Sequence, residues 1–139
     1  MLRRPAALLL AALMGIALPA LAEGPYLSAP SVAQLAAADV LLVDIRTPGE
    51  WRRDGVLPQA LLVEYTGDDA RFLADLAPHL DGRPVALVCR SGNRTAQAAA
   101  ALAPALEVPV IDLAGGMNRL RAAGVQVSAP TRAQGCASC

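Results

Sequence analysis

Residues 84–95 read PVALVCRSGNRT, and they indicate the fold class more clearly than any other part of the chain. It opens with an apolar run that is typical of a buried strand, and the run ends at Cys89. Gly92 marks a turn, and from Thr95 to Leu106 the apolar spacing is helical. A strand that passes through a short loop into a helix is the repeating unit of parallel α/β sheets, so this class is the starting hypothesis.

The rest of the chain repeats the same alternation. Apolar runs predict strands at residues 40–45, 60–65, 84–89 and 109–113. Helical patterns predict helices at residues 48–53, 69–80, 95–106 and 117–123, and Pro104 is expected to end the third of them early. Strands that are apolar throughout are buried on both faces. We therefore expect an α/β fold in which a small parallel sheet of about five strands is covered by helices on both faces.

Residues 1–22 have the features of a cleavable secretory signal peptide. Arg3 and Arg4 precede an apolar core, and the small-residue site Ala20-Leu21-Ala22 follows it. The core is shorter than the roughly 20 residues that a membrane span needs, so no stable membrane association is expected. The sequence predicts a periplasmic or secreted protein, and the arginine pair leaves open whether export uses the general or the twin-arginine route.

Cleavage would leave a single domain, residues 23–127, and a C-terminal tail, residues 128–139, whose small and polar residues predict flexibility. It would also remove two of the twelve arginines of a chain that has twelve carboxylates and no lysine. Scattered arginines on a slightly acidic chain do not favour nucleic acid as a partner. No metal and no cofactor are expected, because a single histidine, His79, offers no set of metal ligands.

The loop that begins at Cys89 has the composition of an anion site. At the carboxyl end of a parallel strand, its backbone N–H groups can form a concave nest at a helix N-terminus. Such surroundings lower the pKa of a thiol, and the thiolate is the nucleophile. We predict Cys89 as the catalytic residue and Arg94 as a forked anion ligand. The predicted substrate-binding residues are Arg90, Ser91, Gly92, Asn93, Arg94 and Thr95.

Two simpler interpretations stand beside these assignments. Cys89 could be a small hydrophobic residue that closes a strand, since free cysteine is among the most buried residue types. Asp44 and Arg46 follow another predicted strand and are candidate supporting residues of the loop, but a structural ion pair is the favoured interpretation. For Glu50, too, a structural ion pair is the favoured interpretation.

Three motifs in register resemble one family. CRSGNR at residues 89–94, VDIRTPGEW at residues 43–51 and LAGGMNRLRAAG at residues 113–124 are similar to motifs of the rhodanese-like domains, the single-domain sulfurtransferases. The resemblance implies that Cys89 takes sulfane sulfur from a small anionic donor such as thiosulfate and holds it as a persulfide. It also implies transfer to a thiophilic acceptor such as cyanide or another thiol.

The length of the loop distinguishes sulfurtransferases from related enzymes of other activity. Residues 89–94 match the sulfurtransferase count, whereas related phosphatases and arsenate reductases use a loop one residue longer. One segment departs from the family pattern, because GVLPQA at residues 55–60 lacks the histidine and second glycine of the family's Gly-His-Ile-Pro-Gly-Ala. The alternatives are a sulfur-carrier or thiol-redox module that acts on a thiol-bearing protein partner, and, with less support, a phosphatase or arsenate reductase.

The tail ends in CASC, with Cys136 and Cys139 spaced as a CxxC pair. In an oxidising compartment such a pair is expected to form a disulfide, and it need have no further role. The bolder hypothesis is a redox pair that accepts sulfur from Cys89 or reduces an oxidised form of it. The sequence leaves both hypotheses open.

Overall fold

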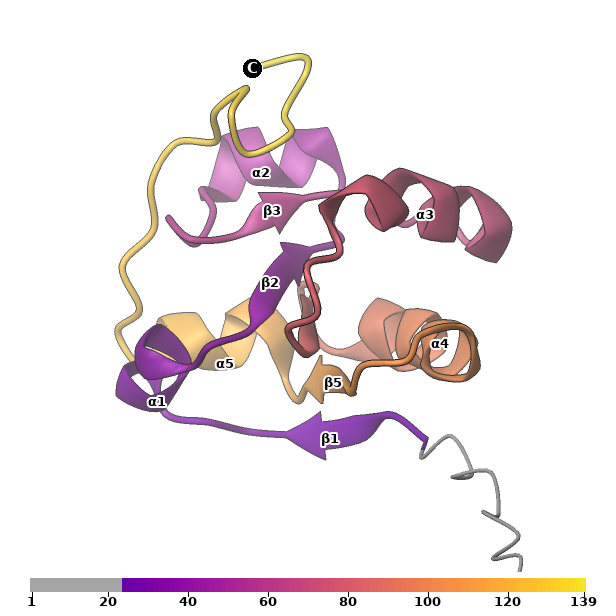
Figure 1. The fold of residues 1–139 in the computed structure, drawn as a ribbon. Helices are drawn as coiled ribbons and strands as arrows, with labels where there is room; N and C mark the ends of the chain where they lie inside the picture. Colours follow the sequence, from indigo (N-terminus) through magenta and orange to yellow (C-terminus); the bar gives the residue numbers. More distant parts are fainter. Residues whose placement is uncertain (1–23) are drawn as a thin grey trace, which may run out of the picture.

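The computed structural model describes residues 24–139, so the expected signal peptide lies outside the described residues. One sheet of five parallel strands runs through the molecule in the spatial order β1-β5-β4-β2-β3 (Figure 1). The strands are β1 (Tyr26–Ser28), β2 (Leu41–Asp44), β3 (Leu61–Leu62), β4 (Val85–Val88) and β5 (Val110–Leu113). The predicted α/β fold with a small parallel sheet is confirmed.

Helices connect the strands. They are α1 (Val32–Ala37), α2 (Pro48–Asp54), α3 (Asp69–Leu76), α4 (Asn93–Leu102) and α5 (Gly116–Ala122). The early end of the third predicted helix is confirmed, because α4 stops at Leu102 and Pro104 lies in a 3₁₀ turn, Ala103–Ala105. Within residues 24–139, the structure has no helix that is both long and apolar enough to span a membrane.

The helices form two layers, one on each face of the sheet (Figure 1). On one face α3 and α4 pack on Val43, Leu87 and Cys89. On the other face α1, α2 and α5 pack on Leu42 and Val88. Each strand residue alternates between these two cores, so β4 is buried along its whole length, which is the reason for its continuous apolar sequence.

Strand β1 and helix α1 were not predicted from the sequence. Two of the three β1 residues are exposed, and Leu27 at the sheet edge is 74% exposed, so the strand has no apolar run to reveal it. The short α1 does carry a signal, because Ser31 and Gln34 form a reciprocal capping box. That spacing predicts a helix start even where the apolar pattern is too short to do so.

The tail was expected to be flexible, and the structure instead packs it against the domain. The backbones of Val56 and Ser128 exchange two hydrogen bonds of 2.9 Å, and Leu62 N–H donates to the Gln134 carbonyl at 2.7 Å. Cys136 is fully buried. The reason is that β3 is a two-residue edge strand whose open backbone groups need partners, and the tail supplies them (Figure 1).

Candidate active site

The cysteine loop, residues 89–94, connects the carboxyl end of β4 to α4 at the middle of the sheet. Helix α4 begins at Asn93, two residues earlier than the predicted start, so Asn93 and Arg94 belong to its first turn. Gly92 is the residue before the helix and has a φ of 103°. Only glycine adopts this backbone conformation without strain, which explains the single glycine of the loop.

The thiol of Cys89 lies at the bottom of this loop and is 1% exposed. Gly92 N–H donates a hydrogen bond to Cys89 Sγ at 3.1 Å, and Thr95 Oγ1 lies 3.6 Å from the same sulfur. Burial raises the pKa of the Cys89 thiol, but hydrogen bonds from the Thr95 hydroxyl and from the loop amides outweigh it. The pKa of Cys89 is therefore lowered, which favours the nucleophilic thiolate.

The start of α5 holds the cysteine loop from the other side. Met117 N–H donates to the Cys89 carbonyl at 2.8 Å, and Asn118 N–H donates to the Arg90 carbonyl at 2.9 Å. A Cβ atom on Gly116 would lie 2.8 Å from the Arg90 carbonyl carbon, so only glycine permits this approach. Because these carbonyl oxygens are bound to α5, the loop is held in the orientation in which Gly92 N–H points at the sulfur.

Arg94 was predicted to bind an anionic substrate through two parallel hydrogen bonds. In the structure its guanidinium binds a carboxylate of the protein instead. The two terminal nitrogens of Arg94 bind the two carboxylate oxygens of Glu50 at 2.7 and 2.6 Å. The hydrogen bond from Arg94 is the main cause that lowers the pKa of Glu50 to about 2. Since Glu50 also accepts a hydrogen bond from Thr47 N–H at the start of α2, Arg94 ties the cysteine loop to α2.

Asp44 and Arg46 form a buried ion pair at the end of β2. Arg46 Nη2 lies 2.6 Å from Asp44 Oδ2 and also donates to the Gly55 carbonyl at 2.8 Å. Both side chains are at most 1% exposed. This geometry agrees with the favoured interpretation of a structural pair, although Arg46 also reaches the cavity described next.

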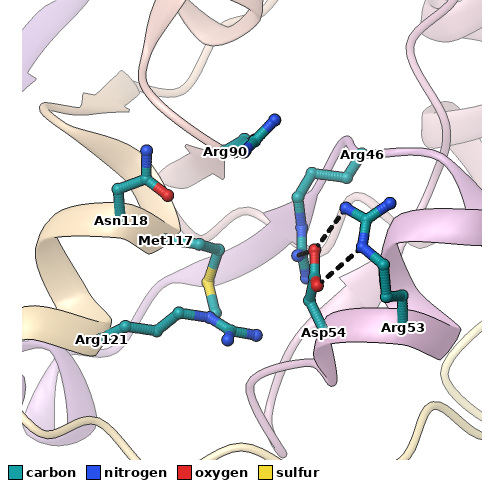
Figure 2. Close-up of a pocket in the computed structure, with 7 residues that line it drawn as sticks. All are labelled: Arg46, Arg53, Asp54, Arg90, Met117, Asn118 and Arg121. Atoms are coloured by element: carbon teal, nitrogen blue, oxygen red, sulfur yellow. Dashed lines mark hydrogen bonds and ion pairs between the residues drawn. The ribbon is translucent and has the colours of Figure 1, made fainter.

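A cavity of about 400 Å³ opens beside the loop, between α2 and α5 (Figure 2). Asp54, Met117 and Asn118 line it together with four arginines, which are Arg46, Arg53, Arg90 and Arg121. Of these residues, only Arg46 and Arg90 were predicted from the sequence as candidate site residues. The others come from two helices far apart in the sequence, and their convergence depends on the packing of α2 and α5 on one face of the sheet.

The tail cysteines are joined in a disulfide and do not lie with Cys89. Cys136 is bonded to Cys139 and packs with Trp51 and Leu62 in the core under α2. Cys89, a free cysteine, belongs to the core on the opposite face of the sheet. In the part of the chain that the structure describes, no cluster of side chains could hold a metal ion.

The chain is similar to known proteins of one family. The family model of the rhodanese-like domain matches residues 28–123. A sulfurtransferase from Allochromatium vinosum is 37% identical over 92 residues, which cover 66% of this chain and 81% of the relative. This relative supports sulfur transfer as the general chemistry of the site.

Two solved structures have the same fold. Rv0390 from M. tuberculosis superposes with a TM-score of 0.62 at 24% identity, over 77% of this chain and all of the other (100%). A protein from Rhodopseudomonas palustris, described as of unknown function and a possible tyrosine phosphatase, superposes with a TM-score of 0.56 at 25% identity, over 76% and 84% of the two chains. With the family model matched across most of the described chain, the protein belongs to the rhodanese-like domain family.

Proposed function

We propose that the protein is a thiosulfate sulfurtransferase-like enzyme in which Cys89 carries the sulfur as a persulfide. The observation that carries the proposal is the buried Cys89 thiol, whose sulfur accepts the Gly92 N–H at 3.1 Å and whose pKa is lowered. A thiolate is the form that attacks sulfane sulfur. We infer that the N–H groups of the loop would also stabilise the negative charge of a persulfide at Cys89.

The first half-reaction forms the persulfide. The Cys89 thiolate attacks the sulfane sulfur of thiosulfate, the sulfur–sulfur bond of the donor breaks, and sulfite leaves with its electron pair. In the second half-reaction a nucleophilic acceptor attacks the outer sulfur, and Cys89 leaves as a thiolate. Sulfur is transferred without an external oxidant, because each half-reaction breaks one bond to the sulfane sulfur and forms another.

Phosphate chemistry has weaker support. The loop of residues 89–94 has the six-residue length expected for sulfur transfer, and its concave side is closed by a sulfur that is 1% exposed. These features favour a small sulfur atom over a larger oxyanion at the bottom of the loop.

We further propose that the protein works in the periplasm or outside the cell. The signal-like pattern of residues 1–22 supports this location. The disulfide between Cys136 and Cys139 also fits an oxidising compartment.

The test is the intact mass of the purified protein after incubation with thiosulfate. We expect a gain of about 32 Da, one sulfur atom, in the wild type and none in Cys89→Ser. Failure of every sulfane donor to produce the gain would contradict the proposal. A gain that dithiothreitol removes but cyanide does not would instead favour a carrier that serves a protein partner, whereas a gain that neither reagent removes is the oxidation of Cys89 to sulfinic acid.

A further inference from the structure

The disulfide between Cys136 and Cys139 has one buried and one exposed end. Cys136 is fully buried, in the core that contains Trp51 and Leu62. Cys139, three residues later, is exposed, and the end of the tail lies beside α2 (Figure 1). A thiolate that opens a disulfide must approach one of its two sulfur atoms. Here the approach is possible only from the side of Cys139.

Hydrogen bonds that do not involve the disulfide hold the tail against the sheet. Ser128 and Val56 exchange two backbone hydrogen bonds. Gln134 accepts a hydrogen bond from the backbone of β3 and donates its side-chain amide to carbonyls of residues 57–60. All of these contacts lie before the cysteine pair in the chain. The disulfide therefore adds only the ordering of residues 137–139.

A structural role explains little of this cysteine pair. A disulfide stabilises a fold chiefly by constraining the unfolded chain, and the effect grows with the number of residues in the closed loop. The sequence separation of the two cysteines is 3, so the loop is among the shortest that a disulfide can close. The same CxxC spacing is found in pairs that exchange electrons, because it favours a reactive thiol.

A positive charge lies next to the exposed cysteine. Arg52 Nη1 donates a hydrogen bond of 2.7 Å to Oγ of Ser138, the residue directly before Cys139. No carboxylate within residues 24–139 forms an ion pair with Arg52. After reduction, the charge of Arg52 favours the thiolate of Cys139, whereas the apolar core favours the neutral thiol of Cys136. The reduced pair thus consists of one reactive and one buried thiol.

We propose that Cys136 and Cys139 form a second reactive site, which exchanges electrons with a partner that carries two neighbouring thiols. A thiolate of the partner attacks Sγ of Cys139, the bond between the tail cysteines breaks, and Cys136 leaves with the electron pair and takes up a proton. The second thiolate of the partner then attacks the partner's own sulfur in the mixed disulfide and releases Cys139 as a thiolate. The partner is oxidised to a disulfide, and the tail pair gains two electrons.

A partner with a single thiol suits this site less well. Its thiolate also forms a mixed disulfide at Cys139, but the thiol of Cys136 is three residues away and expels it again at a high effective concentration. A second thiol on the same partner completes the reduction instead. The exchange does not use Cys89, which lies in the core on the opposite face of the sheet, so the inference does not depend on sulfur transfer.

Reduction of the folded protein provides the first test. The wild type is mixed with dithiothreitol at a series of urea concentrations, quenched with acid, unfolded and alkylated, so that its mass counts the free thiols. We expect the count to rise from one to three, because the chain has three cysteines and one is free. The rate should stay constant in urea until the protein unfolds, as followed by circular dichroism. Reduction that begins only within the unfolding transition would overturn the inference.

Single-cysteine variants identify the reactive sulfur. In the Cys89→Ser background, Cys136→Ala leaves only the exposed thiol and Cys139→Ala only the buried one. With an aromatic disulfide that releases a coloured thiolate, we expect Cys136→Ala to react at least about tenfold faster than Cys139→Ala. Equal rates in the two variants would overturn the assignment of Cys139.

The role of Arg52 is tested in the Cys136→Ala variant. Arg52→Gln should slow the reaction of Cys139 at pH 7 about threefold, because the thiolate loses a nearby positive charge. Arg71→Gln is the matched control, since Arg71 is an exposed arginine on α3, on the other face of the sheet. Equal rates in Arg52→Gln and Arg71→Gln would contradict the proposed site.

Discussion

Thr95 is the side chain that most directly controls the state of the Cys89 thiol. Its hydroxyl lies 3.6 Å from Cys89 Sγ and 3.0 Å from the Gly92 carbonyl, in a position with no solvent exposure. Desolvation raises the pKa of Cys89. The hydrogen bonds between Thr95 and the sulfur are the largest of the effects that lower this pKa. The loop therefore depends on a buried hydroxyl as well as on its backbone.

We predict that Thr95→Val raises the pKa of Cys89, because the side chain keeps its volume and loses the hydroxyl. The rate of alkylation by iodoacetamide should then rise with pH along a curve displaced to higher pH than in the wild type. Thr66→Val, which removes an exposed hydroxyl, is the control. Coincident curves for wild type and Thr95→Val would show that the amides alone set the pKa.

Glu50 and Arg94 form the ion pair that joins α2 to the cysteine loop. The pKa of Glu50 is lowered from 4.5 to about 2 in the folded protein, first of all by the hydrogen bond from Arg94. A lowered pKa means that the pair stabilises the fold fully above about pH 4.5. The contribution is lost as the pH falls from there towards 2.

We predict that Glu50→Gln lowers the free energy of unfolding at pH 7 by about 2 kcal/mol, because Arg94 is left without its partner. Arg94 is 32% exposed and regains some hydration, which limits the loss. Urea unfolding should show the gap between wild type and variant closing as the pH is lowered towards 2. Glu107→Gln, at an exposed site, is the control, and a gap that stays constant with pH would contradict the assignment.

At the residue scale, the sequence predicted the loop that carries Cys89 but not every side-chain contact of that loop. Cys89 could be found because its strand, turn and helix are contiguous. The partner of the Arg94 guanidinium could not be predicted, because Glu50 is 44 residues away. In the sequence, Glu50 is explained by the capping box that it forms with Thr47 at the start of α2. Side-chain pairing between elements depends on their packing, which no local pattern contains.

At the scale of elements, the site depends on the contact between the cysteine loop and the start of α5. The double glycine after β5 lets the first N–H groups of α5 reach the carbonyls of Cys89 and Arg90. A Cβ atom on Gly116 would collide with backbone atoms of Cys89 and Arg90. The backbone φ of Gly116 is 55°, which also favours glycine. The motif at residues 113–124 therefore holds the cysteine loop in place as well as making the turn into α5.

We predict that Gly116→Ala slows persulfide formation and destabilises the protein by several kcal/mol, because the loop must move and the backbone is strained. Gly124→Ala is the matched control, since Gly124 has a φ of 81° and open space around its Cα. It should cost only the strain of the left-handed conformation, about 1–2 kcal/mol. Urea unfolding and the rate of mass gain with thiosulfate measure the two effects. Equal losses in both variants would refute this role of Gly116.

The long elements could be predicted from the sequence and the short ones could not. The runs that became β2, β4 and β5 were found because burial on both faces makes them mostly apolar, with Asp44 and Asp112 as the only polar residues among them. In β3 only Leu61–Leu62 is regular strand, although the predicted run extended to Tyr65. Val63 and Tyr65 still donate hydrogen bonds to the carbonyls of Asp44 and Ile45 at 3.2 and 3.0 Å, and their side chains belong to the core with α3. An apolar run indicates burial more reliably than it indicates the length of a regular strand.

At the scale of the whole molecule, the tail is part of the domain that it follows. It pairs with Val56 and Leu62, and Gln134 Nε2 donates to the carbonyls of Leu57, Pro58 and Ala60 at 3.2 Å each. The composition of the tail predicts a flexible segment. The sequence of the tail does not show that its backbone forms hydrogen bonds with an edge strand of the sheet. The disulfide lies within this packed tail, on the face of the sheet opposite Cys89.

We predict that removal of residues 128–139 lowers the free energy of unfolding by a few kcal/mol, because it uncovers the core under α2 and the edge of β3. Cys139→Ser opens the disulfide without touching the buried Cys136 and should cost far less. Persulfide formation at Cys89 should proceed at the wild-type rate in Cys139→Ser. A slower transfer to every acceptor in that variant would instead support a relay through the tail pair.

If one sulfane sulfur passes through Cys89 in each reaction cycle, a single-turnover measurement will detect it. The protein is loaded with thiosulfate, freed of excess donor and mixed with cyanide while its mass and the thiocyanate released are followed. We predict about one thiocyanate per chain, with return of the original mass, and none from Cys89→Ser. Thiocyanate from Cys89→Ser, or a loaded mass that maps to the tail cysteines, would contradict transfer through Cys89.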